Sequence, residues 1–201
     1  MNSANIKRGL GTTELARLCD VTPPTVGRWI KEGKLPSFTT AGGHRRVWAE
    51  DVVAFLREHN IPAPPELRAS ARWTVLIVDD EQPTRKLIAR VVGKVAPEAE
   101  IHEAADGFEA GHKITELVPD LVVLDIRLPG VDGMRICRSI RNTRRFRRVR
   151  VLAVSGYAVE ETRKECLEAG ADDFVGKPFD IAEMERSLYR LAPTAVREGK
   201  K

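Results

Sequence analysis

The sequence predicts an α/β protein in which a doubly wound, five-stranded parallel sheet follows a smaller, mainly helical domain. Residues 73–193 alternate five short β-branched runs with five amphipathic segments, an order typical of a parallel sheet covered by helices on both faces. Residues 61–72 contain closely spaced prolines, which disfavour both helix and sheet. We therefore expect a first domain over residues 1–60, a semi-rigid linker over 61–72, a second domain over 73–193 and a frayed tail over 194–201.

The composition is that of a globular chain and argues against several classes of protein. Hydrophobic residues make up 42% of the 201 residues and charged residues 31%, which is ordinary for a soluble domain. The longest apolar runs are far too short to cross a bilayer, and residues 1–10 carry no apolar signal segment. The three scattered cysteines show neither a disulfide framework nor zinc-ligand spacing. We expect a cytoplasmic protein with no membrane partner.

The positive charge is concentrated in the first third of the chain. Residues 1–72 hold 11 Lys and Arg against 7 Asp and Glu, whereas the remaining residues hold 22 of each sign. The whole net charge of +4 therefore belongs to the first domain and its linker. A basic small domain beside a neutral larger one favours a polyanionic partner for the small one.

Two short helices are expected at the start of the first domain. Thr12 and Thr13 are N-cap candidates for the first helix. The second helix is expected from Thr22 to Glu32, and Gly33 follows where a C-terminal cap is needed. Two short helices joined by a tight turn form a helix-turn-helix.

A β-hairpin or extended loop is expected next, between Phe38 and Val47, with Gly42 and Gly43 at its centre. Its far side carries three basic residues in a row, His44, Arg45 and Arg46. Apolar residues at helical spacing then predict a third helix over residues 49–58 that closes a small core.

The second domain is expected to contain five β/α units. The predicted strands are residues 74–78, 101–104, 121–125, 151–155 and 173–175. The predicted helices are residues 83–95, 108–116, 134–142, 160–168 and 181–191. In such a sheet the ligand site lies beyond the carboxyl ends of the strands.

That rule brings five polar side chains to one edge of the sheet. Asp79 and Asp80 follow the first strand, Asp125 and Ser155 end the third and fourth, and Lys177 follows the fifth. Clustered carboxylates favour a hard cation with oxygen ligands, and Mg²⁺ fits that description. A carboxylate nucleophile, a metal and a lysine are the components of phosphoryl transfer.

Several motifs in this region resemble the receiver domain of two-component response regulators, over nearly all of residues 73–193. The matching motifs are Val78-Asp79-Asp80, Leu124-Asp125, Leu128-Pro129, Asp132-Gly133, Ser155-Gly156 and Lys177-Pro178-Phe179.

The resemblance to the receiver domain implies a role for each site residue. Asp125 would accept a phosphoryl group, and Asp80, Asp125 and the backbone carbonyl of Arg127 would hold Mg²⁺ with assistance from Asp79. Ser155 and Lys177 would contact the phosphoryl oxygens, and the Lys177-Pro178 bond would be cis. Phe174 matches the family's aromatic switch residue, and plain core packing is the alternative.

The first domain resembles the winged helix-turn-helix of the MerR and excisionase families, over residues 10–58. The matching residues are Thr22-Pro23-Pro24-Thr25, Arg28-Trp29, Gly33-Lys34-Leu35-Pro36 and Gly42-Gly43-His44-Arg45-Arg46. The resemblance implies binding to double-stranded DNA. Thr22, Thr25 and Arg28 would face the major groove, while His44, Arg45 and Arg46 on the wing would follow the backbone or minor groove.

A second basic feature is the run from Arg141 to Arg150, which contains six arginines. It has two interpretations, an auxiliary patch that binds phosphates or a partner, and a solvated loop. We favour the solvated loop, because runs of like charge are commonly just exposed.

Together these features predict a response regulator in which phosphorylation of Asp125 by a sensor histidine kinase controls DNA binding and transcription. A single helix-turn-helix makes few contacts with DNA, so tight specific binding favours a homodimer or higher assembly on DNA. The only enzymatic activity expected is self-phosphorylation and dephosphorylation. The alternatives are a phosphorylation-independent architectural DNA-binding protein and a signalling adaptor that docks a kinase or polymerase.

Overall fold

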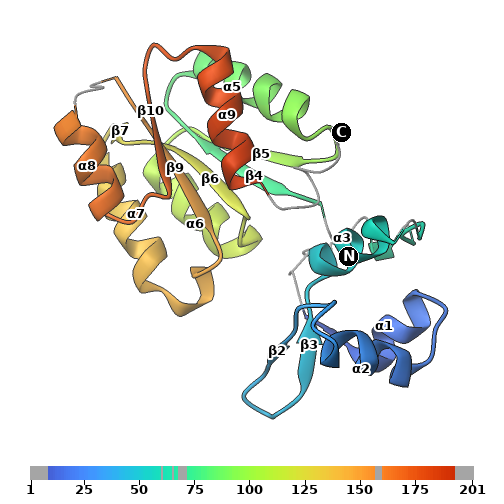
Figure 1. The fold of residues 1–201 in the computed structure, drawn as a ribbon. Helices are drawn as coiled ribbons and strands as arrows, with labels where there is room; N and C mark the ends of the chain where they lie inside the picture. The colour runs from blue at the N-terminus through green and yellow to red at the C-terminus, as the bar shows by residue number, and fades with distance from the viewer. Residues whose placement is uncertain (1–8, 60, 65, 68–71, 157–159, 193–201) are drawn as a thin grey trace. The chain divides into compact units, whose positions relative to one another are not determined.

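The computed structural model describes residues 9–192 except 60, 65, 68–71 and 157–159. The chain divides between Arg72 and Trp73 into two compact units, which we call the head and the sheet domain (Figure 1). Among the described residues, no helix combines the length and the apolar character needed to cross a membrane.

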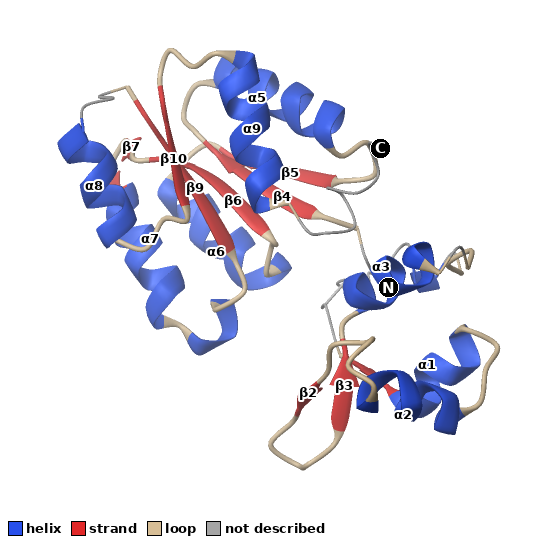
Figure 2. Cartoon of the chain, viewed as in Figure 1, coloured by secondary structure: helices blue, strands red, loops and turns tan. Residues whose placement is uncertain are grey.

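The head contains three helices, α1 (Thr12–Leu18), α2 (Pro23–Lys31) and α3 (Ala49–Glu58), and three short strands, β1 (Leu10–Gly11), β2 (Phe38–Thr39) and β3 (Arg45–Val47). The strands form an antiparallel sheet in the order β1-β3-β2 (Figure 2). The predicted helix-turn-helix and hairpin are therefore present. Strand β1 was not predicted, because two residues are too few for an alternating pattern.

The start of α1 differs from the prediction. Gly11, in an extended conformation, occupies the N-cap position, and Thr12 is already the first helical residue. Thr22 does occupy the N-cap position of α2, with Pro23 in the first helical position.

The core of the head extends into the proline-rich stretch. Trp29 and Phe55 pack with their ring centroids 4.8 Å apart, and Phe38 stacks on Trp48 at 4.4 Å. Leu67 is only 1% exposed and belongs to the same apolar cluster. Part of the stretch assigned to a linker by sequence therefore packs as core of the head.

The sheet domain has five parallel strands, β4 (Thr74–Val78), β5 (Glu100–Ala104), β6 (Leu121–Asp125), β9 (Arg150–Ser155) and β10 (Asp173–Gly176). Their order is β10-β9-β6-β4-β5, the doubly wound arrangement expected. The helices are α5 (Gln82–Val95), α6 (Gly107–Leu117), α7 (Gly133–Asn142), α8 (Glu160–Glu168) and α9 (Ile181–Leu191). Helices α5 and α9 pack together on one face of the sheet, and α6, α7 and α8 cover the other (Figure 1).

Burial explains why the central strands read as continuous apolar runs. Every residue of β4 and β6 is buried, because helices cover both faces of the sheet. Two small elements were not predicted, the hairpin of β7 (Arg127–Leu128) with β8 (Val131–Asp132) and the 3-10 turn η1 (Arg144–Phe146). The peptide bond Lys177-Pro178 is cis, as the resemblance implied.

Candidate functional site

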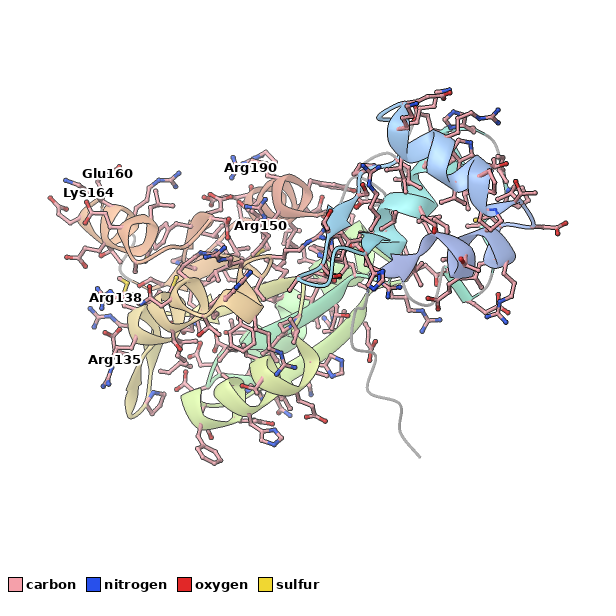
Figure 3. All side chains as sticks on the ribbon, turned by 90° about the horizontal axis from the view of Figure 1, so that it is seen from below. Arg135, Arg138, Arg150, Glu160, Lys164 and Arg190 are labelled. Carbon is pink, nitrogen blue, oxygen red and sulfur yellow. The ribbon has the colours of Figure 1, made fainter. Side chains whose placement is uncertain are left out.

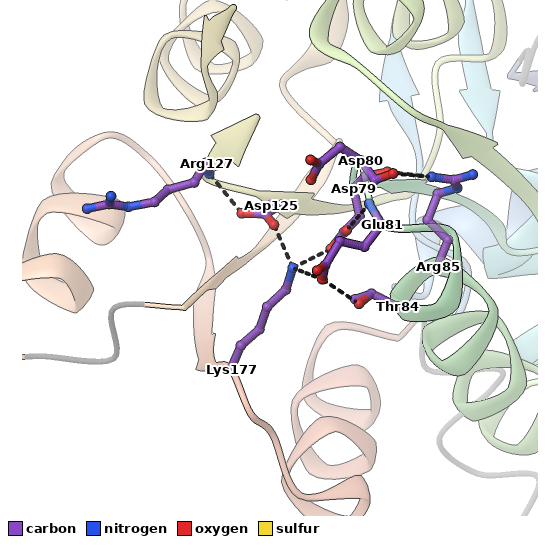
Figure 4. Close-up of polar contacts among 8 residues, drawn as sticks. All are labelled: Asp79, Asp80, Glu81, Thr84, Arg85, Asp125, Arg127 and Lys177. Carbon is purple, nitrogen blue, oxygen red and sulfur yellow. Dashed lines mark hydrogen bonds and ion pairs between the residues drawn. The ribbon is translucent and has the colours of Figure 1, made fainter. Parts of the chain in front are cut away.

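The carboxyl edge of the sheet gathers the acidic residues identified in the sequence. Strands β4 and β6 are neighbours, so Asp79, one residue beyond β4, lies beside Asp125, the last residue of β6. Lys177 follows β10 and reaches the same edge (Figure 4). Ser155 ends β9 and is fully buried, and its carbonyl accepts the Lys177 N–H at 2.7 Å. The parallel topology thus brings these residues to one place.

Lys177 bridges the two buried carboxylates. Its Nζ donates to Oδ2 of Asp79 at 2.7 Å and to Oδ2 of Asp125 at 2.6 Å, and lies 3.7 Å from Oε2 of Glu81. Asp79 is 1% exposed and Asp125 is 6% exposed. One cation therefore faces two carboxylates that water hardly reaches, which holds their oxygens in a fixed geometry.

Burial affects the titration of both partners. Desolvation raises the pKa of Asp79, and the Lys177 ammonium only partly offsets that rise. Desolvation also acts to lower the pKa of Lys177, but its hydrogen bonds to Asp125 and Asp79 outweigh this and leave the pKa raised. Lys177 is therefore firmly charged. Burial destabilises the charged form of Asp79, and a second cation nearby would stabilise it.

Backbone groups orient the remaining carboxylate oxygens. Oδ1 of Asp79 accepts the N–H of Glu81 at 2.9 Å, and Oδ1 of Asp125 accepts the N–H of Arg127 at 2.8 Å. The Arg127 side chain points away from Asp125 in Figure 4. At Gly133 a Cβ atom would lie 2.7 Å from the carbonyl oxygen of Asp125, so only glycine lets α7 begin this close to the site.

The acidic group fits a hard divalent cation. Asp79, Asp80 and Asp125 each offer one carboxylate oxygen, and these oxygens lie within 4.8 Å of one another. Asp80 is exposed, which leaves room for water ligands. Oxygen ligands with access to water suit Mg²⁺.

Arg85, in the first half of α5, contacts the site but was not predicted from the sequence. Its Nη1 donates to the carbonyl of Asp79 at 2.7 Å and to that of Asp80 at 3.2 Å, and its Nε pairs with Oε2 of Glu103 at 2.8 Å. Arg85 thereby fixes the backbone of Asp79 and Asp80, which we call the acidic loop. No local pattern distinguishes it from other helical arginines.

Phe174, in the middle of β10, is 6% exposed and packs in the core beneath α6, α7 and α8. This placement is compatible with either role considered for it, so its switch role stays a prediction.

The head offers a second candidate site, at the start of α2 and along the wing formed by β2 and β3. Oγ1 of Thr22 lies 2.9 Å from Oγ1 of Thr25, and Arg28 is exposed on the same helix. His44 and Arg45 are exposed on the wing.

The wing has a tight tip and a more packed base. Gly43 has a φ of 78°, which favours glycine, and its N–H donates to the carbonyl of Thr40 at 2.9 Å. Arg46 is half-buried, because it lies in the central strand of the small sheet and packs close to Gly11.

The wing and the start of α1 enclose a hollow of about 330 Å³, lined by Gly11, Thr12, Thr13, Glu14, His44, Arg45 and Arg46. From the sequence, Thr12 and Thr13 were considered only as helix caps. Both residues also line the hollow beside the basic residues of the wing.

Comparison with protein families assigns both regions. Residues 75–189 match the response regulator receiver domain, and residues 10–60 match a helix-turn-helix domain.

Curated relatives resemble the sheet domain. The chain is 35% identical to the regulatory protein AtoC of Escherichia coli over 116 residues, which are 58% of this chain and 24% of that protein. It is 32% identical to the phosphate regulon transcriptional regulatory protein PhoB of the same species over 128 residues, 62% of this chain and 55% of PhoB. The chain thus spans about a quarter to a half of these relatives.

Solved structures give the same result. The receiver domain of a DNA-binding response regulator from Colwellia psychrerythraea matches with a TM-score of 0.57 and 27% identity, over 59% of this chain and 97% of that one. The BeF3-activated receiver domain of DrrB matches with a TM-score of 0.53 and 28% identity, over 60% of this chain and 97% of that one.

Proposed function

The chain belongs to the response regulator family and joins a receiver, the sheet domain, to a helix-turn-helix head, and from this premise we propose that phosphorylation of Asp125 controls its binding to DNA. The observation that carries the proposal is the position of Lys177 between Asp79 and Asp125 at the edge of the sheet. This arrangement supplies a nucleophile and a charge that stabilises the group it receives.

Asp125 is the proposed acceptor. One of its carboxylate oxygens attacks the phosphorus of the donor and forms an acyl phosphate, and the bond to the donor's leaving group breaks. The donor is a phosphohistidine of a sensor histidine kinase or a small acyl phosphate. Lys177 Nζ, 2.6 Å from Oδ2 of Asp125, is placed to offset the added negative charge.

Mg²⁺ is the cofactor in this proposal. Asp79, Asp80, Asp125 and the backbone carbonyl of Arg127 would hold it. When bound, the ion neutralises charge on the phosphoryl oxygens. Arg85 keeps the carbonyls of Asp79 and Asp80 fixed, which positions their side chains for this task.

Ser155 and Phe174 would convert the new charge into a change of shape. The hydroxyl of Ser155 would bond a phosphoryl oxygen, and Phe174, two strand pairs from the end of the same β9–β10 ladder, would adjust with it. A change in this ladder and the adjoining helices would alter self-association, in a homodimer or a larger assembly.

The head is the proposed DNA-binding part. Thr22, Thr25 and Arg28 at α2 would face the major groove, and His44, Arg45 and Arg46 of the wing would contact the backbone or minor groove. The activity proposed is regulatory rather than metabolic, with Asp125 self-phosphorylation and dephosphorylation as its chemistry, and a cytosolic location follows from the DNA partner. One relative is a cyclic di-GMP phosphodiesterase response regulator of Xanthomonas campestris, of which the match covers 33%.

The test uses the full chain and its Asp125→Asn variant. Each is incubated with Mg²⁺ and acetyl phosphate, phosphoryl incorporation is read by intact mass, and DNA binding is measured on genomic fragments before and after. Asp180→Asn, which changes an exposed aspartate at the start of α9, is the matched control. We expect incorporation and a change in DNA affinity in the wild type and the control, and neither in Asp125→Asn.

Two outcomes favour the alternatives. Equal DNA binding by all variants, with or without the phosphoryl donor, would indicate an architectural DNA-binding protein. Phosphoryl incorporation without salt-dependent DNA binding would indicate a signalling adaptor.

A further inference from the structure

The stretch from Gly133 to Arg150 has an unusual charge pattern. It contains eight arginines, no lysine and no acidic residue, although the chain beyond residue 72 is balanced at 22 charges of each sign. The structure places seven of these arginines, all except Arg148, in two groups with different environments.

The first group holds the fold together. Arg141 donates through Nε to the carbonyl of Gly170 at 2.6 Å, through Nη1 to that of Val149 at 2.7 Å, and through Nη2 to Asp172. Arg150 pairs with the other oxygen of Asp172 at 2.6 Å. Arg141 and Arg150 are therefore structural, which corrects the view of the whole Arg141–Arg150 run as a solvated loop.

The second group, which we call the arginine face, comprises Arg135, Arg138, Arg144, Arg145 and Arg147. All five side chains are exposed, and no carboxylate of the described residues lies within 4.0 Å of them. Arg135 and Arg138 project outward from α7 in Figure 3. The other three follow in and after the turn η1.

The arginine face extends far enough to follow a nucleic-acid backbone. From Arg135 to the end of α7 at Asn142, seven steps of about 1.5 Å span roughly 10 Å before the turn is added. One DNA strand presents a phosphate about every 3.4 Å along the helix axis, so the face matches several phosphates. Arginine suits this partner better than lysine, because its planar group binds phosphate oxygens in pairs.

The same face is poorly suited to a protein partner. The large hydrophobic residues that are exposed in the described chain are Ile61, Leu87, Phe108, Leu167 and Ile181, and none lies between residues 133 and 150. Protein interfaces have cores depleted of charge, whereas DNA interfaces are strongly positive.

We propose that the arginine face is a second DNA contact, on the receiver itself, that binds backbone phosphates without reading sequence. The inference rests on the proposed function of the head, which brings a duplex to the chain. Once the head is bound, the receiver experiences a high effective concentration of DNA, so that weak phosphate contacts add usefully to affinity.

The test compares the salt dependence of DNA binding by full-length variants. Arg138→Gln, Arg144→Gln and Arg147→Gln are combined, since these exposed positions take no part in the Asp172 network. The matched control combines Lys86→Gln, Arg90→Gln and Lys94→Gln, which remove the same charge from exposed positions on α5, on the other face of the sheet.

We expect the arginine-face triple to lose about 2.7 units of slope in log K against log salt, and at least about tenfold affinity near 0.1 M salt. The control triple should match the wild type. A triple Arg→Lys variant at the same three positions should keep most of the slope, because it keeps the charges.

Three outcomes overturn the inference. The first is an equal slope of log K against log salt for the arginine-face and control triples. The second is a loss of slope in the lysine variant as large as that in the glutamine variant. The third is a change in self-association without DNA while the slope stays unchanged, which would indicate a protein interface. An Arg28→Gln, Arg45→Gln variant separates this failure from failure of the proposed function. If that head variant loses DNA binding while the arginine-face triple does not, only the second contact is wrong.

Discussion

The acidic edge of the receiver and the wing of the head both gather charge of one sign, but they differ in exposure. Asp79 and Asp125 are buried against a single internal cation, Lys177, whereas His44 and Arg45 face solvent. Buried charges have few alternative arrangements and hold a fixed geometry, which suits chemistry. Exposed charges keep mobile counterions that a partner releases, which suits binding. The two sites should therefore respond to mutation in different observables, stability at the edge and salt-dependent affinity at the wing.

The largest effect should follow removal of the buried cation. Lys177→Met leaves Asp79 and Asp125 without their shared partner, and we expect a loss of about 3 kcal/mol of unfolding free energy at neutral pH. Chemical denaturation of the full chain measures it, with Lys86→Met on exposed α5 as the control. If Lys177→Met loses no more unfolding free energy than Lys86→Met, the carboxylates at the sheet edge are as well solvated as the charges of the wing.

The next effect concerns binding and not folding. The double change Arg28→Gln and Arg45→Gln should reduce the slope of log K against log salt by about 1.8 and weaken DNA binding about tenfold or more. Fluorescence anisotropy with labelled duplex measures the slope, and Lys86→Gln with Arg90→Gln is the control pair. Because both residues are exposed, the melting temperature should stay within a degree or two, and a large fall would contradict the comparison.

A smaller effect of opposite sign should follow removal of one buried negative charge. Asp79→Asn should stabilise the metal-free chain at neutral pH, by less than Lys177→Met destabilises it, because burial raises the pKa of the native carboxyl group. Denaturation in EDTA measures the gain, and it should shrink when Mg²⁺ is added. Destabilisation in EDTA would show that Lys177 more than compensates for burial.

The smallest effect is the pH dependence of that gain. A carboxyl group whose pKa rises on folding binds its proton more tightly in the folded state, so stability falls as pH rises from its ordinary value of 3.8 through the raised pKa. The difference between wild type and Asp79→Asn in EDTA should therefore grow with increasing pH over this window and then level off. A difference that is constant with pH would assign the gain to packing.

The sequence predicted the parts of the fold that have a local signature. Strands β4 and β6 are continuous apolar runs, and Asp125 and Lys177 could be placed because parallel strands end at one edge. The same reasoning did not reveal Arg85, whose carbonyl partners depend on the path of the acidic loop.

Long-range pairs were equally hidden from the sequence. Arg141 and Asp172 are 31 residues apart, and a run of arginines gave no sign that one member would be enclosed by backbone carbonyls. Strand β1 has two residues and exists because Leu10 pairs with Val47. Such features depend on tertiary packing, which composition and periodicity do not encode.

Leu67 has a consequence for the modularity of this chain. Because this side chain completes the core of the head, the proline-rich stretch is more than spacing between two exchangeable parts. A head excised at residue 60 would lack a core residue, whereas one cut between Arg72 and Trp73 would keep it. A fusion of the head to another signalling domain must therefore include the proline-rich stretch. Recombination within that stretch would remove a core residue from the head and would not join two intact domains.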